Sequence, residues 1–171
     1  QCRALSDSDQ ALMLANHLAR VLRERDRKAT VAYLAYHNTL AAPRQVKPEH
    51  NMFLEFAPIH RRYDVPFEQQ TDERAGDTLA ALVANLEVFD ARTAQIVEYW
   101  LDLSRFSGWK RPTPRLPWHA PLDLADLDAY GSLGVRQVTT FAVYLDAEYV
   151  KTFGEPPAEE YGRLLSEWRP R

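Results

Sequence analysis

The sequence predicts an α/β fold in which a mainly parallel sheet of four strands is flanked by helices. Four short runs are almost continuously apolar instead of alternating between apolar and polar residues. Runs of this kind are typical of strands that are buried on both faces of a parallel sheet. Segments with helical periodicity separate most of these runs. The 171 residues, of which 46% are hydrophobic and 26% charged, suffice for one globular domain of ordinary size.

The first element is an amphipathic helix at residues 6–27. Ser6 has the side chain of a good N-cap, and its hydroxyl can accept a hydrogen bond from the first turn. We expect one stripe of residues at helical spacing to be buried: Leu14, Leu18, Val21 and Leu22. The basic residues that end this helix are interpreted as solvated cations at the negative end of its dipole rather than as a phosphate site.

The four predicted strands cover about residues 31–37, 51–57, 95–101 and 137–144. The connection between the first two contains Pro43 and Pro48 and has no helical stripe. Its length just reaches the dozen or so residues that a parallel crossover needs. An antiparallel pair with a long loop is the alternative interpretation.

Further helices are predicted at residues 72–89, at residues 122–132 and after Pro157. In the first of these, the apolar stripe consists of Leu79, Leu82, Val83 and Leu86. The last has an apolar face made of Tyr161, Leu164, Leu165 and Trp168. Residues 104–121 contain four prolines and predict a long, stiff surface loop.

Four parallel strands with helices on one side amount to half of a (β/α)8 barrel, which typically takes about 250 residues. Such a half-barrel has two unpaired strand edges and one bare sheet face. We therefore expect residues 1–171 to form a single domain that is part of a larger chain, or to be covered by another copy. The chain begins with Gln1 rather than Met, and no export signal is visible in it.

Composition excludes several classes of function. The net charge of −3 provides no broad basic surface for nucleic acid. No apolar run is long enough to span a membrane. The single cysteine, Cys2, cannot form an internal disulfide or an all-cysteine zinc site. There is no glycine-rich phosphate loop and no Ser or Cys nucleophile motif, and we expect neither a metal nor a cofactor.

Polar and aromatic residues collect at the C-terminal ends of the predicted strands, where parallel barrels hold their functional groups. This composition suits a sugar, because amides and carboxylates bind hydroxyl groups while aromatic rings pack on the sugar ring. The candidate substrate-binding residues are His37, Asn38, His60, Arg61, Tyr99, Trp100, Trp109 and Trp118. Glu98 is the candidate catalytic carboxylate.

Each candidate also has a structural interpretation. His37 and His60 fit hydrogen-bonded histidines at strand ends better than metal ligands, because no ligand spacing accompanies them. Glu98 can pair with Arg61 or Arg62 instead of acting in catalysis. Glu55 is expected to be paired with another side chain or partly exposed to water. Tyr99 and Trp100 are neighbours in a strand and point to opposite faces, so one of them is expected in the core.

We interpret Asp102 as a helix cap or loop residue rather than as a catalytic residue.

In AYLAYHNTLAAPRQVKPEHNMFLEFAPIHRRYDVPF, a strand ending in Tyr leads through a Pro-rich connection to an Asn-led strand and an Arg-containing turn. In this stretch the chain resembles a family of bacterial proteins known as domain of unknown function 4838. SDSDQALMLANHLARVL, which includes Asn16, is similar to the helix before that strand. QIVEYWLDL, DLDAYGSLGVRQV and LDAEYVKTFG follow in the family's order, so the resemblance covers nearly the whole chain.

That family is similar to (β/α)8 glycoside hydrolases near the α-glucuronidases and β-hexosaminidases. The resemblance implies an extracellular or periplasmic bacterial protein that acts on a glycan through carboxylates, in which this chain supplies barrel strands five to eight. It places Glu98 and Tyr99 at a strand-seven position that often contacts sugar, while the acid near strand four would lie upstream. A non-catalytic glycan-binding barrel is the alternative, and an unrelated α/β protein is a third hypothesis.

Overall fold

A computed structural model of the chain describes residues 5–70 and 73–169, with only the backbone described at residues 73–77. Its sheet contains β1 (Val31–Ala35), β2 (Met52–Phe56), β3 (Gln95–Asp102) and β4 (Gln137–Val143), in that spatial order. Every neighbouring pair is parallel. The predicted α/β class and parallel sheet are therefore confirmed, and the antiparallel interpretation of the first two strands is wrong.

The helices are α1 (Asp7–Arg25), α2 (Glu73–Leu86), α3 (Leu103–Phe106), α4 (Ala120–Ser132), α5 (Ala147–Phe153) and α6 (Ala158–Glu167). Two 3-10 turns, η2 (His37–Thr39) and η3 (Phe67–Gln69), follow β1 and β2. The short helices α3 and α5 were not expected. Each begins after an aspartate whose side chain accepts hydrogen bonds from the first turn, a signal that was present in the sequence. The predicted start of the second helix at residue 72 lies outside the described residues.

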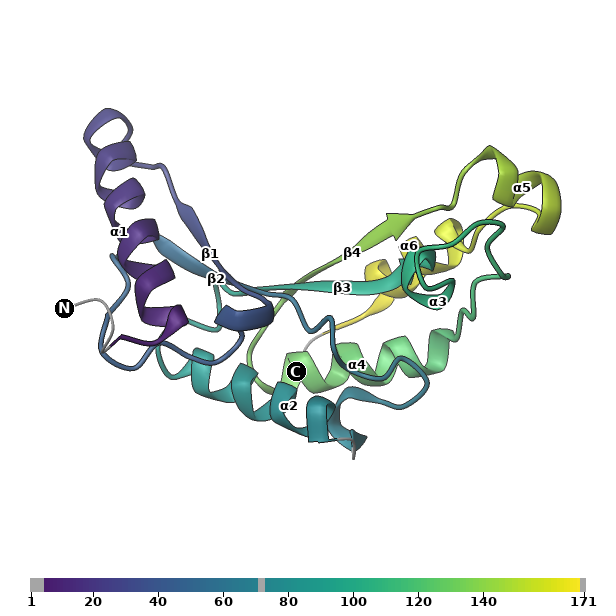
Figure 1. Cartoon of the computed structure of the whole chain (residues 1–171), viewed down its shortest axis with the longest axis horizontal. Coiled ribbons are helices and arrows are strands. Elements are labelled where there is room, and N and C mark those ends of the chain that lie inside the picture. The colour runs from purple at the N-terminus through teal and green to yellow at the C-terminus, as the bar shows by residue number, and fades with distance from the viewer. Residues whose placement is uncertain (1–4, 71–72, 170–171) are drawn as a thin grey trace.

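Helices α2 and α4 lie along one face of the sheet, and the opposite face is open (Figure 1). Alternate strand residues point to opposite faces. Tyr33, Leu54 and Ile96 are fully or almost fully buried in the main core, whereas Leu34 of β1 and Phe141 of β4 are nearly half exposed. The apolar face of α6 packs against the same core as expected. The sheet therefore has one covered and one accessible face.

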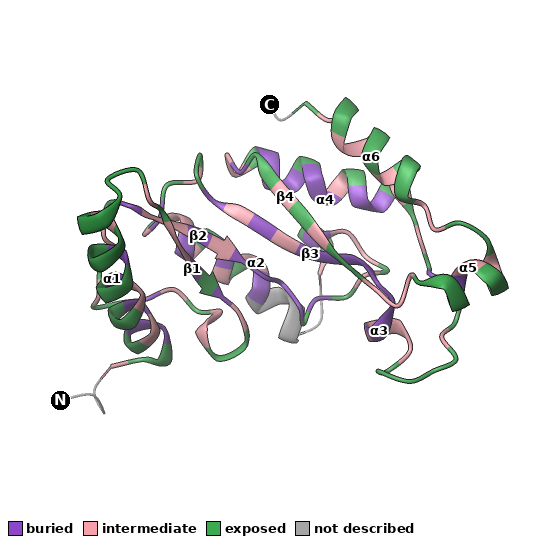
Figure 2. Ribbon diagram, turned by 90° about the horizontal axis from the view of Figure 1, so that it is seen from above, coloured by how far each residue is buried: buried purple, intermediate pink, exposed green. Residues whose placement is uncertain are grey.

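The buried face of α1 differs from the one that the sequence predicts. Ser6 caps the helix as expected, but the predicted stripe is exposed, with Leu14 exposed by 65%. Figure 2 shows that most of α1 is exposed. The buried residues are Ser8, Asp9, Leu12, Asn16 and Ala19.

The segment between β1 and β2 explains this correction. The Asp9 carboxylate accepts hydrogen bonds from the backbone N–H groups of residues 44, 45 and 46 at 2.8–3.0 Å. The Asn16 side chain donates to the carbonyl of Lys47 and accepts from the N–H of Glu49. Because a helix-free connection must satisfy its backbone groups elsewhere, the polar face of α1 turns toward it and the apolar stripe turns away.

In the described ranges, 5–70 and 73–169, no helix combines the length and the apolar character needed to cross a bilayer.

Candidate functional site

A pocket of about 370 Å³ lies on the open face of the sheet. We call it the open-face pocket; its walls come from all four strands and the segments after them: Leu34, Tyr36, Glu55, Ala57, Ile59, Val97, Tyr99, Asp102, Trp109, Phe141 and Val143. Its volume falls within the roughly 300–1,000 Å³ typical of small-molecule sites. Several of these residues follow the C-terminal ends of β1, β2 and β3, which is the functional end of a parallel barrel.

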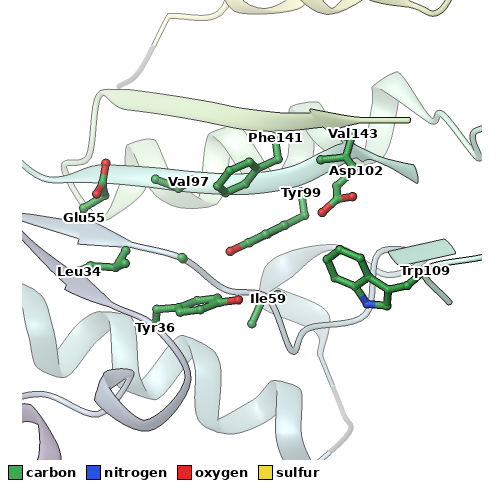
Figure 3. A pocket seen from close by; sticks show the side chains of 11 residues that line it. Leu34, Tyr36, Glu55, Ile59, Val97, Tyr99, Asp102, Trp109, Phe141 and Val143 are labelled. Atoms are coloured by element: carbon green, nitrogen blue, oxygen red, sulfur yellow. The ribbon is translucent and has the colours of Figure 1, made fainter. Parts of the chain in front are cut away.

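Aromatic rings dominate this pocket (Figure 3). The rings of Tyr99 and Phe141 are stacked with centroids 5.1 Å apart. Burial raises the pKa of Tyr99, and its interaction with Tyr36 acts in the same direction, so its phenol stays neutral. Because Tyr99 is almost fully buried, it contributes one edge of the pocket rather than an exposed platform.

Trp109 supplies the exposed aromatic surface. Its side chain is 67% exposed, and its backbone has φ of 64°, a conformation that side-chain-bearing residues rarely adopt. The N–H of Trp109 donates to the Ser104 carbonyl at 2.8 Å, which fixes this turn directly after α3. Local strain of this kind is held by surrounding structure and is concentrated at functional sites.

Two carboxylates line the same pocket, Glu55 of β2 and Asp102 of β3. The Asp102 side chain caps α3 and accepts from the N–H of Ser104 at 3.1 Å, so the predicted capping role is confirmed. In Figure 3 its carboxyl group also points toward the pocket between Tyr99 and Trp109. Glu55 is partly exposed there, which agrees with the partly wet interpretation.

A register shift in β3 brings Asp102 to this pocket. By strict alternation, Asp102 would share a face with Glu98 and Trp100, which lie on the covered side. The pairing of β3 with β4 is irregular between Glu98 and Leu101, and such a bulge re-aims the residues beyond it. Asp102 was interpreted as a cap or loop residue rather than a catalyst, and sequence periodicity does not indicate the bulge that also brings it to the pocket.

Glu98 lies on the opposite face, away from the open-face pocket. Its side chain is completely buried and forms an ion pair with Arg61 at 3.2 Å, which is the structural alternative considered for it. Tyr130 of α4 donates a short hydrogen bond to Glu98, and Arg61 is also paired with Asp126 of α4. We call Arg61, Glu98, Asp126 and Tyr130 the buried ionic cluster.

The buried ionic cluster is closely hydrogen bonded. The Asp126 carboxylate accepts from the N–H of Phe67 at 2.6 Å and from the indole of Trp100 at 3.1 Å. Burial raises the pKa of Asp126 to about 6, although Arg61 acts against this rise. For Arg61, burial lowers the pKa, but the neighbouring carboxylates of Glu98 and Asp126 outweigh it and hold the pKa above its usual range. The cluster joins β3, α4 and the loop after β2 under the sheet.

The other predicted binding residues lie outside the open-face pocket. His37 and His60 are in contact, with Nδ1 and Nε2 2.8 Å apart, as expected for hydrogen-bonded histidines at strand ends. His37 and Asn38 line a different cavity, against α2. Trp100 is buried in the main core, and Trp118 is half-buried between α3 and α4. Of the predicted binding residues, the open-face pocket brings together Tyr99 and Trp109.

No cluster of three or more His, Cys, Asp or Glu side chains suited to a metal ion occurs in the described part of the chain.

The family model described as "Domain of unknown function (DUF4838)" matches residues 3–103, which include α1, α2 and the first three strands. No curated protein and no solved structure matches the chain. Because the matched residues make up more than half of the sequence, the chain belongs to the domain of unknown function 4838 family.

Proposed function

We propose that the protein is a glycoside hydrolase-like, carbohydrate-active protein that binds a glycan in the open-face pocket. The observation that supports this most directly is Trp109, whose exposed indole stands beside the pocket that also contains Tyr99 and Asp102. An aromatic face packs against the C–H side of a sugar ring, and a carboxylate oxygen accepts hydrogen bonds from its hydroxyl groups.

Binding by the full protein tests this proposal. A glycan array identifies a bound oligosaccharide, and titration calorimetry then measures its Kd for the wild type and for Trp109→Ala. We expect the substitution to weaken binding by about 10- to 100-fold, since buried tryptophan contacts are among the largest in interfaces. Glu24→Ala, at an exposed position of α1 outside its apolar stripe, serves as the control and should leave Kd unchanged. Equal affinities of wild type and Trp109→Ala would contradict the proposal.

Hydrolysis is the second candidate, and the Asp102 carboxylate at the C-terminal end of β3 in this pocket favours it. Most glycosidases use a pair of carboxyl groups, but in substrate-assisted enzymes one acid donates a proton to the leaving oxygen. Glu55 pairs in register with Gln95, at the opposite end of β3 from Asp102, so these two carboxylates lie too far apart to act as such a pair. Because Glu98 is enclosed by the buried ionic cluster, we assign the role of the acid to Asp102.

For a glycan that the protein cleaves, Asp102→Asn should lower kcat by about 100-fold or more while leaving Kd within about threefold. The asparagine keeps the size of the side chain and an oxygen that can cap α3, so binding and folding should be retained. Release of reducing sugar measures kcat. Full turnover in this variant would remove Asp102 from the chemistry, and binding without any turnover by the wild type would leave the glycan-binding alternative.

In this proposal the protein is a longer chain, and its further strand–helix units complete the barrel. Two observations support it: the sheet has accessible edges at β1 and β4, and α1 exposes a stripe made of Met13, Leu14, Leu18, Val21 and Leu22. A contiguous apolar helix face next to a sheet edge is typical of an interface with another unit. The family resemblance further favours an extracellular or periplasmic location.

A further inference from the structure

A second site lies on the other side of β3 from the open-face pocket. An outer cavity of about 580 Å³ opens between the loop after β2, α3 and the start of α4. A small recess of about 10 Å³ adjoins it, and the two share Tyr63, Phe106, Pro117 and His119. The recess also contacts Trp118 and Asp123, and its volume matches a single water-sized group.

The recess contains polar atoms that the rest of the described chain does not satisfy. Asp123 is only 4% exposed, yet its Oδ2 has no hydrogen-bond partner among the described residues. The buried indole Nε1 of Trp118 is in the same situation. A buried polar atom without a hydrogen bond is unfavourable, so a group that bonds to both atoms would be favoured here.

The chemistry of these two atoms restricts what fits. The Trp118 indole can only donate, so the bound atom must accept, which excludes an ammonium group. Burial raises the pKa of Asp123 to about 8; Asp126, Glu98 and Glu160 act in the same direction, and Arg61 opposes them. The carboxyl group is therefore mostly protonated at neutral pH and ionised above about pH 8. A hydroxyl can bond to Asp123 in either state, whereas an anion is repelled once Asp123 is ionised.

We propose that the recess binds one hydroxyl group of a saccharide whose ring occupies the outer cavity, with Trp118 and Asp123 as the two hydrogen-bonding partners. Tyr63, Phe106 and Pro117 provide the apolar walls for the ring. The His119 ring accepts a hydrogen bond from the N–H of Leu122 through Nδ1, which leaves its Nε2–H as a further donor at the shared wall. The choice of a saccharide rests on the proposed function, but the site is separate from the open-face pocket.

The test uses the indole N–H signals of Trp118 and Trp109 in a ¹H–¹⁵N NMR spectrum of the full protein. Methyl β-D-glucopyranoside and glycerol are the hydroxyl probes, and acetate is the anionic probe. Trp118→Phe and Trp109→Phe assign the two signals, so that the recess and the open-face pocket report separately. We expect a hydroxyl probe to shift the Trp118 signal saturably, and Asp123→Ala to weaken this binding by about 3- to 10-fold.

Movement of the Trp109 signal alone would overturn the second site and leave the proposed function intact. Movement of the Trp118 signal alone would support the recess while removing support from the open-face pocket. A response of Trp118 to acetate and not to either hydroxyl probe, or no saturable response at all, would overturn the proposal. Circular dichroism of Asp123→Ala and Asp123→Asn checks that the variants are folded, and the asparagine variant, which keeps an accepting oxygen, should bind better than the alanine variant.

Discussion

Replacement of Arg61 by methionine should lower the free energy of unfolding by about 3–5 kcal/mol, the largest stability effect that we expect for a single side chain in this protein. Arg61 is 2% exposed and pairs with both Glu98 and Asp126, whose side chains have no access to solvent. Methionine fills much of the same volume but leaves two carboxylates buried without their cation. Urea denaturation followed by circular dichroism measures the change.

The neighbouring residue provides a matched control. Arg62 pairs with Asp64, but both side chains are largely exposed, at 47% and 68%. Exposed ion pairs contribute about 0–1 kcal/mol, so Arg62→Met should change stability by less than about 1 kcal/mol. Similar decreases in the free energy of unfolding for Arg61→Met and Arg62→Met would show that the buried ionic cluster does not hold the sheet to α4. Loss of glycan turnover in Arg61→Met would follow from unfolding, because Arg61 does not line the open-face pocket.

Replacement of Asp9 by alanine should lower the free energy of unfolding by about 2–3 kcal/mol, because charge-assisted hydrogen bonds to several backbone groups are lost together. Asp9 is 1% exposed and accepts from three consecutive N–H groups of the connection between β1 and β2. Without the carboxylate these donors are left with no partner. Asp7→Ala is the control, since Asp7 lies in the same helical turn but is exposed.

The Asp9 carboxylate also predicts a pH dependence. Burial raises its pKa, but hydrogen bonds from Ser6 and the backbone of Val46, Gln45 and Arg44 outweigh this and lower the pKa from 3.8 to about 2. Because the folded state holds the ionised form, its stabilisation is complete above about pH 4 and is lost as the pH falls to about 2. Asp9→Ala should remove this part of the acid destabilisation. A wild type and a variant with parallel stability curves between these pH values would contradict the assignment.

The strands were predictable from the sequence because both of their faces carry apolar side chains, of which one set packs in the core and the other lines the open-face pocket. VAYLA and QIVEYWLD are continuous apolar runs broken by few polar residues, and each became a strand of the parallel sheet. The final helix was predictable for a related reason. Its apolar residues have only one surface to pack on, so periodicity alone identifies the buried face.

The candidate site was less predictable. Trp109 and Tyr99 were found because each lies in or after β3, near the end of the strand where parallel barrels hold their sites. The capping role of Asp102 was predicted, but its place in the pocket was not, because a bulge changes which side of β3 it faces. Asp123 and Trp118 meet only because α4 folds back beside the loop that precedes it.

By itself, the amino-acid sequence determined the class of fold, the four strands and the four longer helices, since these depend on the local order of apolar and polar residues. Only the tertiary structure decided which face of α1 is buried, that Glu98 pairs with Arg61 under the sheet, and that Asp102 reaches the open face. Each of these outcomes depends on which of several groups, distant in the sequence, form hydrogen bonds with one another and become buried. This in turn depends on which segments meet in space, and spacing along the chain does not record that.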